Sequence, residues 1–299
     1  MSFATDIKAE LCKKETSTCC RIAECYGILL FGRAFSVQNI SVTTENEDVI
    51  CLLSGLLSRC YGVQPDISVG GKSKDFFTAT IKDKEKRQEI LNSLGYFGFK
   101  PGDDIIKRHN LEEECCKASF IRGAFLSCGT ISDPNKSYHA EFPVNDPALA
   151  TELYLLINEI GLSPRLSARG SKRAVYFTGN ESVSDLLTYI GAGAYTLKIA
   201  DISVYKDMRN RLNRITNCET ANISKTVNAA VNQCMAIKKL IDSGEFYKLS
   251  AELQKVGQLR LENDQASLTE LSELFGGEIT KSGLNHRLKR LVTLAENLD

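Results

Sequence analysis

The stretch from Thr280 to Leu294 holds the side chains best suited to chemistry with another macromolecule. It contains five Lys, Arg or His residues and no acidic residue, although the whole chain balances 37 basic against 37 acidic residues. Asn can hydrogen-bond adenine bidentately, whereas Lys and Arg can read guanine or neutralise phosphates. We therefore expect this stretch to bind DNA, some residues reading base edges and others holding the backbone. The base-reading set is Ser282, Asn285, His286 and Lys289, and the other contacts are Thr280, Lys281, Arg287 and Arg290.

The elements around this stretch predict a helix-turn-helix over about residues 267–295. Ser267 and Glu270 have the spacing of a capping box that begins a short helix, and Gly276-Gly277 ends it in a tight turn. The second helix of such a motif enters the major groove of DNA. A basic helix surface that only contacts solvent is the alternative interpretation. The predicted core face of the second helix consists of Leu284, Leu288, Leu291 and Ala295.

Residues 223–299 are expected to form an all-α domain that ends in this motif. Its first helix is predicted from an apolar stripe, and Gly244 ends that helix. The preceding residues, 198–222, are interpreted as a basic linker that either grips the DNA backbone or is only solvated. The stripe contains Val227, Ala230, Val231, Cys234, Ile237 and Ile241, and the candidate backbone contacts of the linker are Arg209, Arg211 and Arg214.

Residues 1–197 are expected to form a separate α+β domain built from an internal repeat. Gly27 opens Gly-Ile-Leu-Leu-Phe-Gly, and Gly123 opens Gly-Ala-Phe-Leu-Ser-Cys-Gly 96 positions later. The periodicity predicts an αββαββα order in each copy. Small residues should let the two glycine helices pair closely. The copies cover about 1–97 and 111–192, and the glycine helices about 20–33 and 113–127.

Two turns at equivalent places in the repeat are basic and could touch phosphates as a second DNA contact. Exposed turns commonly carry such residues, so a solvated turn without a ligand is the alternative. The surface could also have been reused to bind a protein or a small ligand. The basic residues are Lys72 and Lys74 in the first copy and Arg169, Lys172 and Arg173 in the second.

This order of elements resembles the LAGLIDADG homing-endonuclease fold, with residues 121–129 in the place of the motif. In that family each motif helix ends with an acidic residue that helps to hold divalent metal ions for phosphodiester cleavage. Here Cys128 occupies that position in the second copy, and Phe31, Gly32 and Arg33 close the first. These residues offer no hard oxygen ligand. We therefore expect that nuclease activity is lost, with a working site-specific endonuclease as the alternative.

Longer segments resemble the WhiA family of Gram-positive bacterial regulators, and the resemblance runs over essentially the whole chain. They are residues 281–291, 217–222 and 129–139. The resemblance implies a degenerate LAGLIDADG domain joined to a helix-turn-helix domain similar to a sigma-factor promoter-reading domain. It implies a sequence-specific transcriptional regulator of sporulation, cell division or chromosome segregation. Its partner would be double-stranded DNA, and the N-terminal platform could bind another regulator or RNA polymerase.

The composition excludes several other classes of protein. Eleven cysteines without a Cys-x-x-Cys pair indicate reduced thiols rather than a disulfide framework. The group Cys12, Cys19, Cys20 and Cys25 fits no zinc-binding pattern, so we expect no metal and no cofactor. The first residues do not resemble a signal peptide, and no apolar stretch approaches the ~20 residues that span a bilayer. We expect a cytoplasmic, nucleoid-associated protein that is not an enzyme.

Overall fold

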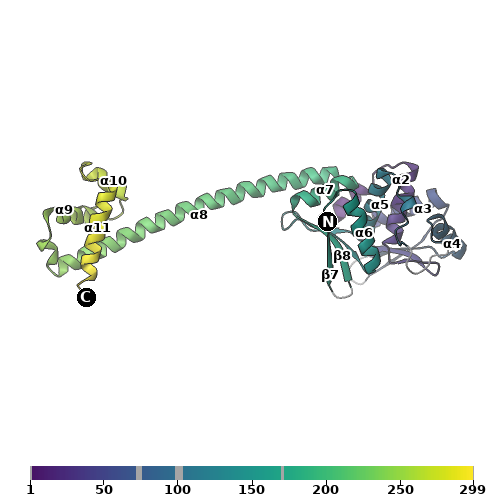
Figure 1. Ribbon diagram of the computed structural model, residues 1–299, viewed down its shortest axis with the longest axis horizontal. Coiled ribbons are helices and arrows are strands. Elements are labelled where there is room, and N and C mark those ends of the chain that lie inside the picture. The colour runs from purple at the N-terminus through teal and green to yellow at the C-terminus, as the bar shows by residue number, and fades with distance from the viewer. Residues whose placement is uncertain (1, 72–75, 98–103, 170–171, 299) are drawn as a thin grey trace. The chain divides into compact units, whose positions relative to one another are not determined.

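The chain divides into an α+β unit and an all-helical unit, as the sequence predicts (Figure 1). The computed structural model describes residues 2–71, 76–97, 104–169 and 172–298, except for the side chains of residues 168, 169 and 172. Unit 1 comprises Met1–Lys206 and unit 2 comprises Asp207–Asp299.

Unit 1 contains two copies of the αββαββα order, which confirms the predicted fold class. The four strands of each copy form one antiparallel sheet, in the order β1-β2-β4-β3 in the first copy and β5-β6-β8-β7 in the second. A short helix that the sequence analysis did not predict, α1 (Phe3–Leu11), precedes the first copy. The first copy contains α2 (Thr18–Leu30), β1 (Ala34–Phe35), β2 (Ile40–Thr44), α3 (Glu47–Tyr61), β3 (Asp66–Gly70), β4 (Phe76–Thr80) and α4 (Lys84–Ser93). After a 3-10 turn, η1 (Arg108–Asn110), the second contains α5 (Glu114–Ser127), β5 (Thr130–Ile131), β6 (His139–Val144), α6 (Pro147–Glu159), β7 (Arg165–Arg169), β8 (Lys172–Thr178) and α7 (Asn180–Ile190).

Each sheet has one face that packs on helices and one open face. On β6, Ala140, Phe142 and Val144 are buried, whereas His139 and Glu141, which alternate with them, are only half-buried. This alternation is typical of antiparallel strands with one solvated face. Strand β8 continues the buried face, because Phe142 pairs with Val175 and Ala140 with Phe177.

The helices α2 and α5 pair at the two glycines that the repeat predicts (Figure 1). A Cβ atom on Gly27 would lie 2.2 Å from the carbonyl oxygen of Phe120, and one on Gly123 would lie 2.3 Å from that of Glu24. Because the two contacts are equivalent, the helices are related by a pseudo-two-fold axis. A buried ion pair also joins them, with 2.7 Å between Arg122 Nε and Glu24 Oε1.

A single 50-residue helix, α8 (Gly193–Asp242), replaces the predicted linker. The predicted domain limits at 197 and 223 fall inside this helix, and the division between the units falls after Lys206. No Gly or Pro occurs between Gly193 and Gly244, so nothing in the sequence stops the helix. Neither α8 nor any other described helix combines the length and apolar character needed to cross a membrane.

Unit 2 continues after α8 with four shorter helical elements around one core. Ile237 and Leu240 contribute the α8 side of this core. Val227 and Val231, which the predicted stripe included, are about half exposed, at 52% and 50%. The apolar face of α8 therefore enters the core only near its C-terminal end. The remaining elements are η2 (Glu245–Lys248), α9 (Ala251–Glu262), α10 (Leu268–Leu274) and α11 (Lys281–Glu296).

Candidate nucleic-acid interface

The helices α10 and α11 have the local geometry of a helix-turn-helix. The capping box is formed, since Glu270 Oε2 accepts from the Ser267 backbone N–H at 2.7 Å and Ser267 Oγ accepts from that of Glu270 at 3.3 Å. Gly276 and Gly277 then take φ values of 81° and 74°, which only glycine adopts readily. The turn is therefore specified by residue type.

Thr280 begins the second helix as its N-cap. Its Oγ1 atom accepts a hydrogen bond from the Gly283 backbone N–H at 3.2 Å. In the preceding turn, Ser272 Oγ donates to the Ile279 carbonyl oxygen at 2.6 Å and ties α10 to the start of α11. Because the Thr280 hydroxyl serves the helix end, this residue positions α11 as well as lying on its exposed side.

The predicted core face of α11 is buried. Leu284, Leu288, Leu291 and Ala295 are at most 3% exposed, and they pack with Leu271, Phe275 and Ile279 from α10 and the turn. Burying a Leu side chain contributes roughly 1.5–3 kcal/mol, so this face fixes the rotation of α11 about its axis. The opposite face is therefore held toward solvent.

Most of the predicted contact residues lie on that outer face. His286, Lys289 and Arg290 are exposed along the helix. Lys281 and Ser282 are exposed at its N-terminal end, where the helix dipole favours an anion such as phosphate. Asn285 is half-buried and lines a groove of about 240 Å³ together with Lys281 and Lys225 of α8. The described outer face thus combines amide, imidazole, hydroxyl and cationic groups.

Arg287 is engaged inside the protein instead. Its guanidinium pairs with Glu252 of α9, with 2.5 Å between Nη2 and Oε1, and its Nη1 donates to the Gly283 carbonyl oxygen at 3.1 Å. The side chain is 29% exposed. The sequence predicts that Arg287 contacts a phosphate, whereas in the structure its side chain holds α11 against α9.

Arg260 of α9 is a positioning residue that the sequence analysis missed. It is 2% exposed, and its Nη1 atom donates to the carbonyl oxygens of Ala266 at 2.8 Å and of Asn263 and Asp264 at 3.3 Å. These carbonyls belong to the loop that leads into α10. A signal was present, because Arg260 falls between Leu259 and Leu261, but its partners are main-chain atoms that no side-chain pattern reveals.

The secondary contact candidates fall in three places. Arg209, Arg211 and Arg214 lie exposed on α8. Arg173 is half-buried on β8 and lines a surface hollow with His139, Glu141 and Tyr176. Arg169 and Lys172 pair through their backbones at the ends of β7 and β8. The structure does not describe the side chains of Arg169 and Lys172, and Lys72 and Lys74 lie outside the described part of the chain.

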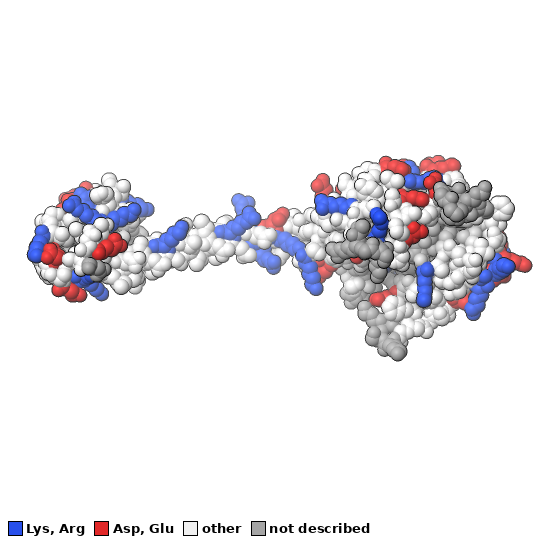
Figure 2. Space-filling view, turned by 60° about the horizontal axis from the view of Figure 1, so that its bottom comes forward, with Lys and Arg blue, Asp and Glu red and all other residues white. Residues whose placement is uncertain are grey.

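The described strands of the two sheets differ in charge. The described strands of the first sheet contain no Lys or Arg, and Asp66 is their only charged residue. Strands β7 and β8 contain four basic residues, which are Arg165, Arg169, Lys172 and Arg173. On the face of the molecule shown in Figure 2, basic and acidic side chains are interspersed. The described strands of the second sheet therefore contain more basic residues than those of the first.

The motif position that would carry a catalytic carboxylate instead holds a thiol and an amine. Cys128 caps the C-terminal end of α5, and burial raises the pKa of its thiol to about 12. Beside it, Lys8 Nζ of α1 donates to the Leu126 carbonyl oxygen at 3.0 Å. Burial lowers the pKa of Lys8. In the first copy, Gly32 offers no side chain at all. A neutral thiol and an amine provide no site for Mg²⁺.

Comparisons with known proteins agree with this division of the chain. A model described as the WhiA LAGLIDADG-like domain matches residues 117–209, and one described as the WhiA C-terminal HTH domain matches residues 212–295. The chain is 35% identical over 307 residues to the "Probable cell division protein WhiA" of Ruminiclostridium cellulolyticum, covering 100% of this chain and 98% of that protein. The protein of the same name from Oceanobacillus iheyensis is also 35% identical, with the same coverage.

A solved structure shows the same fold over the full length. It is that of full-length DUF199/WhiA from Thermatoga maritima, with a TM-score of 0.60, 21% identity and 99% coverage of both chains. Together, the family models, the relatives and this structure agree on both domains and on their order. The chain therefore belongs to the WhiA family.

Proposed function

We propose that this protein is a sequence-specific DNA-binding regulator of transcription that reads its target through α11. The observation that carries the proposal is the outer face of α11. From Lys281 to Leu294 it has cationic and amide groups and no acid, and it is held outward by a buried leucine face. A helix presented in this way after a tight turn fits the major groove. The base-reading residues are then Ser282, Asn285, His286 and Lys289, while Lys281 and Arg290 hold phosphates.

The relatives suggest which genes are controlled. Those from Ruminiclostridium cellulolyticum and Oceanobacillus iheyensis are named as probable cell division proteins. We extend that role to this chain, with targets that concern cell division, chromosome segregation or, following the family resemblance, sporulation. DNA binding of this kind would place the protein on the nucleoid.

We further propose that unit 1 does not cleave DNA. Two-metal cleavage needs oxygen ligands at the ends of both motif helices. Cys128 and Gly32 stand at those ends, and the Lys8 amine lies beside the first of them. Purified protein is expected to leave supercoiled plasmid intact in the presence of Mg²⁺ or Mn²⁺. Metal-dependent nicking that a single Asp or Glu substitution abolishes would overturn this part of the proposal.

A salt titration of DNA binding tests the role of α11. In the full chain, Lys281→Ala with Arg290→Ala removes the two exposed cations that are assigned to phosphates. If each holds a phosphate, the slope of log K against log salt should become shallower by about two. The matched control, Lys248→Ala, removes an exposed cation on η2 of the same unit and should leave the slope unchanged. An unchanged slope in the α11 variant would contradict the proposal.

A further inference from the structure

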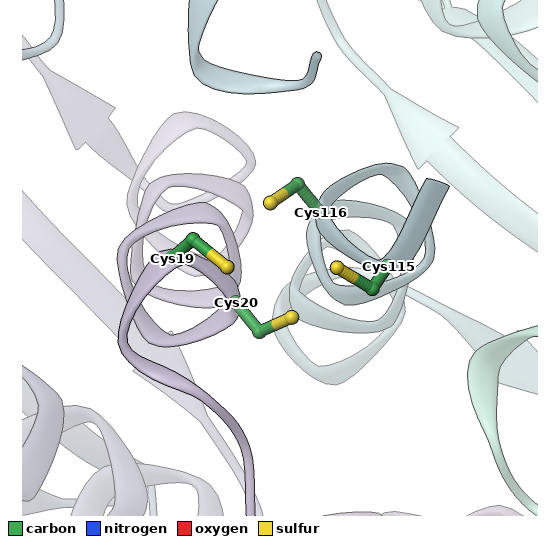
Figure 3. A group of neighbouring side chains, drawn as sticks. All are labelled: Cys19, Cys20, Cys115 and Cys116. Atoms are coloured by element: carbon green, nitrogen blue, oxygen red, sulfur yellow. The ribbon is translucent and has the colours of Figure 1, made fainter. Parts of the chain in front are cut away.

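Four cysteine side chains meet between the first turns of α2 and α5 (Figure 3). Cys19 and Cys20 are the second and third residues of α2, and Cys115 and Cys116 hold the same places in α5. All four sulfur atoms lie within 4.8 Å of one another. Figure 3 shows the side chains directed from the two helices toward a common point.

The internal repeat brings these cysteines together. Residues 19 and 115 are separated by 96 positions, as are residues 20 and 116, and this is also the spacing of Gly27 and Gly123. Because the glycines let the two helices approach, equivalent residues one or two turns away must also face each other across the pseudo-two-fold axis. Two adjacent cysteines in each copy thus become a cluster of four in the folded unit.

The position of the cluster in the fold suits anionic ligands. The cluster lies at two helix N-termini, whose dipoles stabilise negative charge. Cys19 and Cys115 are exposed whereas Cys20 and Cys116 are buried. An ion can therefore enter from solvent and be held partly out of it.

The distances point to one ion rather than to a larger cluster or to disulfides. Four thiolates around a single Zn²⁺, each at about 2.3 Å, lie about 3.8 Å from one another. The observed separations reach that value with shifts of about 1 Å or less. An iron–sulfur cluster would hold the thiolates further apart, because its irons and sulfides lie between them. The four cysteines are free in this structure.

We propose that Cys19, Cys20, Cys115 and Cys116 bind one Zn²⁺ ion as four thiolates. This replaces the expectation that the chain binds no metal. Binding releases the thiol protons to solvent and leaves no open coordination position, so the ion is structural rather than catalytic. The site is also remote from the nuclease-like position, since Cys116 and Cys128 are 12 residues, or about 18 Å, apart along α5. The ion would join the two repeats at the start of their paired helices.

Metal analysis of the full-length protein tests the proposal. Protein purified in reductant, loaded with Zn²⁺ and desalted should retain about one zinc ion per chain. Cys115→Ser with Cys116→Ser should lose nearly all of it. The matched control, Cys51→Ser with Cys218→Ser, removes two exposed cysteines outside the cluster and should retain the metal.

Cobalt provides a readout that does not depend on the fold of the double variant. Co²⁺ added to the wild-type protein should give sulfur-to-cobalt charge transfer and the strong visible bands of a tetrahedral thiolate site, and Zn²⁺ should then abolish both. The single variant Cys19→Ser, at an exposed position, should keep its helical circular dichroism and release zinc to a chelator at least tenfold more readily.

Several results would overturn the proposal. These are wild-type protein without retained zinc, equal loss of zinc in the control, bound iron in place of zinc, and disulfides among these cysteines in protein kept in reductant.

Discussion

At the residue scale, the proposed function depends on how much sequence information single side chains of α11 carry. Asn285→Ala removes an amide that can pair with adenine. We expect a loss of about 1–3 kcal/mol on a preferred duplex and a much smaller loss on a scrambled one. Fluorescence anisotropy with a duplex selected from a random pool measures both. Thr293→Ala, which removes an exposed hydroxyl from α11, is the matched control. Equal losses on the two duplexes would exclude base reading by Asn285.

Cys128 gives a prediction about pH. Its thiol pKa is raised from 9.0 to about 12 by burial, so the folded state keeps the proton after the unfolded state has lost it. The contribution is fully present below about pH 9 and is lost as the pH rises toward 12, at up to about 1.4 kcal/mol per pH unit. Above pH 9, the free energy of unfolding should therefore fall less steeply for Cys128→Ala than for the wild type.

Urea unfolding in reductant at several pH values checks this expectation for Cys128. Cys51→Ala, which removes an exposed thiol of α3, controls for loss of a sulfur atom. If the free energy of unfolding changes with pH equally in Cys128→Ala and in the wild type, the thiol titrates alike in the folded and unfolded states, and the expectation is wrong.

At the scale of elements, the pairing of α2 and α5 depends on two glycines. Gly27→Ala would bring a Cβ atom to 2.2 Å from the Phe120 carbonyl oxygen, so the helices must separate. We expect the free energy of unfolding to fall by roughly 1–3 kcal/mol or more, as for other overpacked cores. Gly55→Ala in α3 meets no atom within 4 Å, so better helix propensity should stabilise the protein by about 0.5–1 kcal/mol. Equal effects of both substitutions in thermal or urea unfolding would refute this account of the pairing.

Particular elements show which parts of the fold could be predicted from the sequence. The repeat was predicted because Gly27 and Gly123 mark it, and the capping box and glycine turn of the helix-turn-helix are local signals that need no tertiary information. In contrast, α1 was not predicted, because its packing against α3, α5 and β5 is a tertiary feature. The continuity of α8 was not predicted, because its basic residues were interpreted as a linker, although no Gly or Pro occurs between Gly193 and Gly244. The 96-residue spacing of the cysteines could have predicted the four-cysteine cluster, but only in combination with the pairing of α2 and α5. That pairing brings equivalent residues of the two copies together.

The roles of Arg287 and Arg260 could not be predicted from the sequence. A basic residue on a helix can bind phosphate or hold its neighbours, and its sequence position does not separate the two roles. The ion pair of Arg287 with Glu252 depends on how α9 crosses α11, and the hydrogen bonds of Arg260 depend on the path of a loop. Both are tertiary facts, so the outer face of α11 was predicted better than the residues that position it.

At the scale of the whole molecule, both units carry basic residues, and we expect these residues to have different roles in DNA binding. Unit 2 presents cations on one helix, whereas in unit 1 the described strands of the second sheet contain more basic residues than those of the first. We infer that the second sheet makes a weaker, sequence-independent contact with DNA. Such a contact neutralises phosphates, so it appears in the salt dependence of binding rather than in the preference for a sequence.

Substitutions in the full chain can separate this second contact from that of α11. Arg165→Ala with Arg173→Ala should make the slope of log K against log salt shallower by about one to two on a long duplex, while the preference for the selected sequence stays the same. Lys82→Ala with Lys86→Ala removes two cations from the first repeat and should leave the slope unchanged. If the second-sheet variant keeps the wild-type slope, unit 1 does not touch DNA and its open sheets are free for a protein partner. If both pairs lower the slope equally, the effect reflects overall charge, and the difference between the two sheets has no bearing on DNA binding.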